Sequence, residues 1–133
     1  MKHLSRLAAL TVGLLLSLNL MAADLIDPAP IAVPSNLTSA QVSTEIKRAM
    51  INRGWVVAKE QPGVIDATLS IRSHRAQVKI THDRSQVVIT YVSSENLDYK
   101  EKKGKRLIHR NYNSWVNNLV SDISKNLQMT TIQ

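Results

Sequence analysis

The chain has 133 residues, no cysteine, and 17 Lys and Arg against 10 Asp and Glu. The absence of cysteine excludes disulfides, a catalytic thiol and a lipid-modified N-terminal cysteine, so an apolar core alone must stabilise the fold. With no Phe, two Trp and three Tyr, we expect that core to consist mainly of Val, Ile and Leu packed in sheet and helix.

The first 23 residues have the pattern of a secretory signal peptide. Lys2 and Arg6 make a positive leader, residues 7–20 are mostly apolar, and Met21-Ala22-Ala23 gives a small-residue end. The apolar run of 14 residues is shorter than the roughly 20 that cross a bilayer. We expect cleavage after Ala23 and a periplasmic or secreted product that touches a membrane only before cleavage. An uncleaved anchor is the alternative.

Residues 24–36 contain three prolines, which remove backbone donors and disfavour helix in the residues before them. This segment is predicted to be an extended tether. The remaining residues, 37–133, are enough for one domain and too few for two.

The domain is predicted to begin with a helix. Thr38 and Gln41 match a capping box, and Gly54 supplies a stop. Between them, four apolar residues recur at helical spacing: Val42, Ile46, Ala49 and Met50.

Four short strands are predicted next, over residues 55–60, 65–72, 76–81 and 86–93. Apolar and polar residues alternate there, most clearly in the second and third segments. The connections between these segments are short, which implies antiparallel neighbours in a meander.

Residues 94–109 fit two interpretations. They continue the fourth strand through Leu97 and Tyr99, or they form an exposed hairpin around Lys103-Gly104; we expect a strand extension followed by a loop. Asn113 is predicted to cap a last helix. The apolar stripe of that helix is Val116, Leu119, Val120, Ile123 and Leu127.

These elements predict an α+β fold of order α-β-β-β-β-α. One-sided helices and a one-sided sheet bury their apolar faces together. We therefore expect a two-layer sandwich, in which a four-stranded antiparallel meander carries two helices on one face.

The common catalytic and cofactor motifs are missing. The four glycines are isolated, and no Gly-x-Ser-x-Gly turn occurs. His74 and His82 would lie roughly 26 Å apart along one strand, too far to share a metal. We expect no cofactor, no metal and no enzymatic activity. A small hydrolase is the less favoured alternative, because four carboxylates could meet in space: Glu60, Asp66, Glu95 and Asp98.

The best functional candidate is the segment 100–110, which holds six basic residues and one acidic residue. The rest of the chain after residue 23 is balanced in charge. Such a segment suits an anionic polymer, although a solvated loop is the alternative. No aromatic residue lies within the run of charges, which disfavours nucleic acid. The predicted binding residues are Lys100, Lys102, Lys103, Lys105, Arg106, Arg110 and Tyr112.

A second candidate surface is the polar face of the predicted sheet. In the fourth strand, Val88 and Val92 interrupt that polar face, so a partner protein, a second copy or the tether is expected to cover it. This favours a structural or assembly protein as the second class of function, although we expect a monomer. The polar residues of the face are Thr68, Ser70, Arg72, Gln77, Lys79 and Thr81.

Several motifs resemble those of a group of small proteobacterial envelope proteins and lipoproteins with no agreed activity. They are Arg53-Gly54-Trp55, Gln61-Pro62-Gly63, Ile65-Asp66-Ala67-Thr68, the stretch 94–99 and the stretch 108–119. The resemblance covers most of residues 38–128 and implies a periplasmic or secreted α/β module. Many members carry a lipobox cysteine that this chain does not have. We therefore expect a non-enzymatic envelope module that binds a protein partner or an anionic surface polymer.

Overall fold

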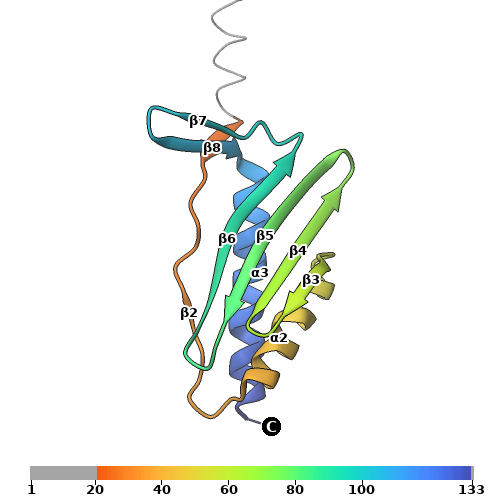
Figure 1. Ribbon diagram of the computed structural model, residues 1–133, viewed down its shortest axis with the longest axis vertical. Helices are drawn as coiled ribbons and strands as arrows, with labels where there is room; N and C mark the ends of the chain where they lie inside the picture. The colour runs from red at the N-terminus through yellow and green to blue at the C-terminus, as the bar shows by residue number, and fades with distance from the viewer. Residues whose placement is uncertain (1–20, 133) are drawn as a thin grey trace, which may run out of the picture.

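The computed structural model describes residues 21–132, so the predicted leader up to residue 20 lies outside the described residues. The fold of these residues is α+β, with two helices and antiparallel strands as predicted, but the strands form two sheets instead of the one that was expected. In Figure 1 helices α2 (Ser39–Asn52) and α3 (Arg110–Thr130) both lie behind the larger sheet. Neither of these helices is long and apolar enough to span a bilayer.

The larger sheet has five strands in the order β2-β6-β5-β4-β3. Four of them follow one another along the chain: β3 (Val56–Gln61), β4 (Val64–Ile71), β5 (His74–His82) and β6 (Gln86–Glu95). The fifth, β2 (Ile31–Ala32), pairs with the outer edge of β6. The predicted four-stranded sheet was therefore incomplete, because the sequence pattern of β2 is only two residues long between prolines.

A second sheet contains β1 (Ala22–Asp24), β8 (Lys105–His109) and β7 (Lys100–Lys102), in the order β1-β8-β7. The prediction of a loop after the fourth strand is wrong, because the chain forms the hairpin around Lys103-Gly104 instead. Lys103 and Gly104 have φ of 53° and 77°. Two consecutive left-handed residues suit a tight two-residue turn, whose twist matches that of the flanking strands.

The predicted tether is extended, but it packs on the domain rather than standing apart from it. Leu25, Ile31 and Val33 are buried, with exposed fractions of 5%, 7% and 9%. The segment runs along the edge of β6, where Val33 N–H donates to Ser85 O at 3.0 Å. It does not cover the outer face of β6, because Val92 is still 44% exposed.

The start of α2 is as predicted. The Thr38 side chain accepts a bond from Gln41 N–H at 3.2 Å, and the Gln41 side chain accepts one from Thr38 N–H at 2.8 Å. This reciprocal pairing is that of a capping box, and it satisfies two donors that the first turn leaves open. The helix ends at Asn52, two residues before Gly54, whose φ of 82° is left-handed.

The start of α3 differs from the prediction. The helix begins at Arg110, and the cap is His109, whose Nδ1 accepts from Asn111 N–H at 3.1 Å. Asn113 lies inside the first turn, where its Nδ2 donates to Asp24 O at 2.8 Å. The asparagine therefore fastens β1 to the helix instead of capping it.

The core lies between the helices and the inner face of the larger sheet. The apolar stripe predicted for α2 is buried, and α3 buries Val116, Leu119, Ile123 and Leu127, whereas Val120 is half-buried. The two helices are joined by an ion pair from Arg53 to Asp122, with Nε to Oδ2 at 2.7 Å and Nη2 to Oδ1 at 3.1 Å. That pair lowers the pKa of the Asp122 carboxyl.

Candidate functional site

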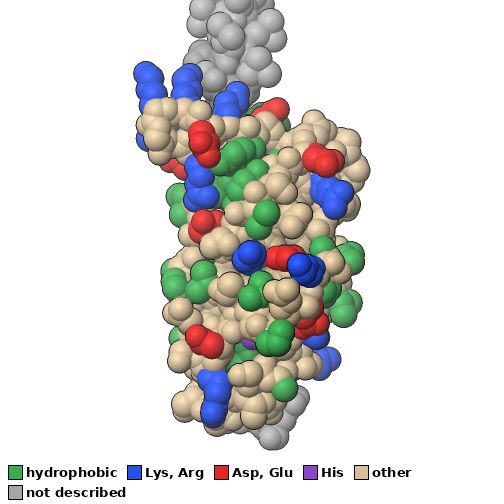
Figure 2. Space-filling view, in the orientation of Figure 1, with side chains coloured by type: hydrophobic (Ala, Val, Ile, Leu, Met, Phe, Trp, Pro, Cys, Tyr) green, Lys and Arg blue, Asp and Glu red, His purple; other side chains and the backbone are tan. Residues whose placement is uncertain are grey.

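The basic hairpin, as we call β7, β8 and the turn Lys103-Gly104 between them, is the most highly charged feature of the surface. Figure 1 shows it at one end of the molecule, and Figure 2 shows several Lys and Arg side chains projecting there. A Cβ atom built on Gly104 would meet no atom within 4 Å, so the tip stands free of the domain. The lysines are therefore open to a ligand.

The register of the hairpin separates its charges between two faces. Lys100 pairs with Leu107, Glu101 with Arg106, and Lys102 with Lys105. Paired residues share a face, and successive residues alternate between faces. Ile108 is 1% exposed, so Arg106, two residues before it, is on the face turned to the core. Lys100, Lys102 and Lys105 are consequently on the outward face, and Lys103 is at the tip.

The inward face of the hairpin is held by specific contacts. The Arg106 guanidinium donates to Asp27 Oδ2 at 3.2 Å. Tyr99 donates from its hydroxyl to Glu101 Oε1 at 3.0 Å. These contacts engage the two charged side chains of the inward face. Arg106 is half-buried, with 37% of its side chain exposed, so its charge is paired with Asp27 at the surface.

Three tyrosines pack beneath the base of the hairpin. The rings of Tyr91 and Tyr99 stack with centroids 4.6 Å apart, and Tyr112 meets Tyr91 edge-on at 5.6 Å. Tyr112 is 2% exposed, and burial raises the pKa of its hydroxyl far above the usual value. Sequence reasoning placed Tyr112 on the binding surface, but the residue is part of the core.

Arg110, the last basic residue of the predicted site, is the first residue of α3 and is exposed. Its backbone N–H donates to Met21 O at 3.0 Å, which joins the start of the described chain to the start of the helix. Of the seven residues predicted for the site, the structure thus brings four lysines together on an open surface and assigns Arg106 and Tyr112 to internal contacts.

The outer face of the larger sheet carries the second group of predicted residues. Asp66 pairs with Lys59 on one side and Lys79 on the other, so opposite charges alternate across three strands. Within residues 21–132, buried Asp66 Oδ1 and Thr68 Oγ1 have no hydrogen-bond partner. The charges on this face offset one another locally, unlike those of the basic hairpin.

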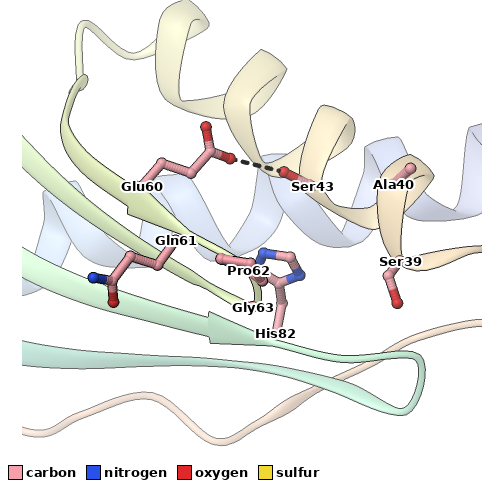
Figure 3. Close-up of a pocket in the computed structure, with 8 residues that line it drawn as sticks. All are labelled: Ser39, Ala40, Ser43, Glu60, Gln61, Pro62, Gly63 and His82. Carbon is pink, nitrogen blue, oxygen red and sulfur yellow. Dashed lines mark hydrogen bonds between the residues drawn. The ribbon is translucent and has the colours of Figure 1, made fainter.

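A hollow of about 350 Å³ lies between the start of α2 and the turn that joins β3 to β4 (Figure 3). The Ser43 hydroxyl donates to Glu60 Oε2 at 3.2 Å, and Lys47 Nζ lies 3.0 Å from the same oxygen. The bond from Lys47 lowers the pKa of the Glu60 carboxyl. The hollow is lined by Ser39, Ala40, Ser43, Glu60, Gln61, Pro62, Gly63 and His82.

A serine, a histidine and a carboxylate therefore line one hollow, although sequence analysis did not single out this combination. The residues are up to 39 positions apart in the sequence, and no local motif links them. A nucleophilic serine needs a hydrogen bond to the base that deprotonates it. Ser43 instead donates to Glu60, and Glu60 is neutralised by Lys47. The contacts fasten α2 to β3.

The three histidines of the described residues, His74, His82 and His109, lie apart from one another or make structural contacts. His74 Nδ1 bonds to Asn96 O at 2.7 Å, and because a carbonyl only accepts, this nitrogen carries the proton. His109 is 6.2 Å from His74 between ring centroids, but its Nδ1 caps α3. Within the described part of the chain, no three His, Asp or Glu side chains are grouped as a metal site requires.

Comparison with known proteins leaves the family resemblance as a prediction. The chain matches no protein-family model, no curated protein and no solved structure.

Proposed function

We propose that this chain is an exported, non-enzymatic module of the cell envelope that binds an anionic surface polymer through the basic hairpin. The observation that carries the proposal is the separation of charge on that hairpin. Three lysines on the outward face and one at the tip would meet phosphate or carboxylate groups, whereas Glu101 and Arg106 are turned inward and already bonded. Clustered cations of this kind raise the local concentration of an anionic ligand.

Retention on immobilised heparin and on lipopolysaccharide tests the proposal. A variant with Lys100→Ser, Lys102→Ser, Lys103→Ser and Lys105→Ser keeps Arg106, and hence the ion pair to Asp27. A matched control changes four exposed basic residues elsewhere to serine: Lys59, Arg75, Lys79 and Arg84. We expect the hairpin variant to elute at much lower salt than the control, since charge contacts are screened by salt. Equal retention of the two variants would contradict the proposal.

Export is tested separately by cell fractionation. The layout of residues 1–23 supports export. Recovery of the folded product from the cytosol alone would contradict this part of the proposal, whatever the outcome of the binding experiment.

A second candidate function is assembly with a partner protein through β3. All six residues of this strand are exposed, and no described strand pairs with its outer side. Val56 and Val57 are 65% and 37% exposed. An open edge of this kind can accept an extended segment of another chain.

Cross-linking in an envelope extract tests the assembly candidate. Val56→Lys and Val57→Lys place repulsive charges on the edge, and we expect them to abolish a specific cross-linked product. The four-serine hairpin variant should keep that product. If the hairpin variant loses the product and the β3 variants keep it, the partner binds the hairpin instead.

A further inference from the structure

The basic hairpin lies where the chain enters the fold. Ala22 of β1 pairs with His109 of β8, and Met21 O accepts from Arg110 N–H. From His109, β8 runs four residues to Lys105, a distance of about 14 Å at 3.4 Å per residue. The apolar run of residues 7–20 directly precedes Met21 in the sequence. The lysines therefore lie at the end of the domain where the described chain begins, and the apolar run directly precedes that end in the sequence.

The outward face of the hairpin carries the lysines together with apolar and acidic neighbours. In Figure 1 β7 and β8 run across the long axis of the molecule, with β7 at its outer edge. Leu107, which pairs with Lys100, is half-buried, and Met21 at the base of the hairpin is 50% exposed. The same face carries one carboxylate of β1, Asp24, which pairs with Leu107. Cations with interspersed apolar groups suit the headgroup layer of a bilayer.

On the basis of the binding function proposed above, we propose a ligand for the basic hairpin in the chain that keeps residues 1–23, the alternative to cleavage after Ala23. That ligand is the anionic phospholipid surface of the bilayer that takes up residues 7–20. A free polymer would account for the lysines but not for their position beside the apolar run. Basic residues just outside an apolar segment are attracted to anionic headgroups, and the attraction decays within about 8 Å at physiological salt. The pairing of β1 with β8 holds the base of the hairpin next to the residues that follow the apolar run in the sequence.

The size of the effect follows from the charges on the outward face. Each basic residue close to an anionic membrane raises the affinity roughly fivefold. Four lysines less the charge of Asp24 leave three net positive charges on this face. We therefore expect the full-length chain to partition about 100-fold more strongly into anionic than into neutral vesicles, and less strongly as salt increases.

Lysine labelling on vesicles tests the proposal with the full-length chain. The chain is bound to vesicles of phosphatidylcholine, with or without phosphatidylglycerol, and the rate of acetylation of each lysine is read by mass spectrometry. We expect the four hairpin lysines to be acetylated at least fivefold more slowly on the phosphatidylglycerol vesicles, and at the original rate in high salt. Exposed Lys59 and Lys79 on the larger sheet are internal controls and should not change. Equal rates on both kinds of vesicle would overturn the lipid proposal.

A heparin arm separates this inference from the proposed function. If heparin protects the hairpin lysines and phosphatidylglycerol vesicles do not, the ligand is a free polymer and the lipid proposal fails alone. If neither protects them, both proposals fail. Protection by vesicles but not by heparin supports the lipid surface and discards the free polymer.

The four-serine hairpin variant tests the same point without labelling. Its preference for anionic over neutral vesicles should fall steeply, to the part that Lys2 and Arg6 contribute, because the apolar run binds both kinds of vesicle alike. The matched control with Lys59, Arg75, Lys79 and Arg84 changed to serine should keep the preference of the native chain. A control that loses the preference as fully as the hairpin variant would show non-specific attraction by total charge and overturn the proposal.

Discussion

The Asp27 carboxylate accepts a hydrogen bond from the Arg106 guanidinium, with Nη2 to Oδ2 at 3.2 Å. The other oxygen of Asp27 accepts from Tyr91 N–H at 3.0 Å. One side chain from the segment before the first helix thus connects the basic hairpin to the edge of β6. The connection explains why a segment rich in proline stays on the domain, and why the hairpin keeps a fixed position.

Two substitutions of Asp27 are expected to weaken that connection to different degrees. Asp27→Asn keeps an acceptor for Tyr91 N–H but loses the ion pair, so we expect a loss of about 0.5–1 kcal/mol in the free energy of unfolding. Asp27→Ala also leaves the half-buried Tyr91 N–H unpaired, and should lose about 1–3 kcal/mol. Urea denaturation measures both. An alanine variant as stable as the native chain would mean that Asp27 makes no net contribution.

The cap of α3 gives a second prediction. His109→Ala removes the acceptor for Asn111 N–H and should lower the free energy of unfolding by about 1 kcal/mol. His109→Asn should restore most of this loss, because asparagine is a good cap. Asn113→Ala should instead weaken the attachment of β1, measured by faster hydrogen exchange in residues 22–24. Were Asn113→Ala to destabilise the helix more than His109→Ala, the cap would be Asn113 after all.

The turn of the basic hairpin gives a third prediction. Lys103 has φ of 53°, a left-handed conformation that glycine and asparagine adopt at a lower cost than lysine does. Lys103→Asn should therefore stabilise the protein by a few tenths of a kcal/mol to about 1 kcal/mol. Gly104→Ala should destabilise it by about 1 kcal/mol, through the backbone alone, because the site is spacious.

Thermal unfolding measures both turn variants, and heparin retention measures the contribution of the Lys103 charge in the same protein. A more stable Lys103→Asn variant with weaker retention would show that the lysine is kept for binding at a cost to the turn. If Lys103→Asn is less stable than the native chain, the strain argument is wrong.

The pH dependence of stability is expected to depend on His82. Burial lowers the pKa of its imidazole below the usual 6.5, against the opposing effects of Glu60 and Asp83 and with a small contribution from Lys47. The unfolded chain therefore binds a proton at a higher pH than the folded protein. Stability should be complete above pH 6.5, decrease as the pH falls from there toward the lowered pKa, and change no further below it.

Urea midpoints at pH 5 and pH 7.5 test this dependence. His82→Gln should show a smaller decrease between the two pH values than the native chain, because glutamine does not titrate. Every other titratable group is the same in both proteins, so the comparison isolates His82. The same decrease in both proteins would show that His82 does not cause the effect.

Much of the fold follows from patterns that lie within a few residues of one another. The capping box of Thr38 and Gln41 fixed the start of α2, and the alternation of apolar residues gave β4, β5 and most of β6. These signals are local, and each has a physical cause within one element. What the sequence did not reveal was pairing between distant segments: Ile31 with Val87, and Ala22 with His109.

Contacts with distant residues also decide which residues of the candidate site are open to a ligand. The lysines of residues 100–105 were visible as a run of charge, but the run itself does not tell which of its members are paired. Asp27, 79 residues before Arg106, neutralises that arginine, and Tyr112 is drawn into the core by Tyr91. Both contacts depend on tertiary structure. The dipeptide Lys103-Gly104 is by contrast a local signal, because a two-residue turn needs residues that accept a left-handed conformation.

The docked segment of residues 25–33 has a consequence for self-association. It closes the β6 edge of the larger sheet, so that β3 is the only long open edge of that sheet among the described residues. Two copies that joined through β3 would form a continuous sheet whose outer margins are both already occupied. Growth would stop at the symmetric pair, and fibrils assembled by edge-to-edge addition would be blocked while the segment stays in place.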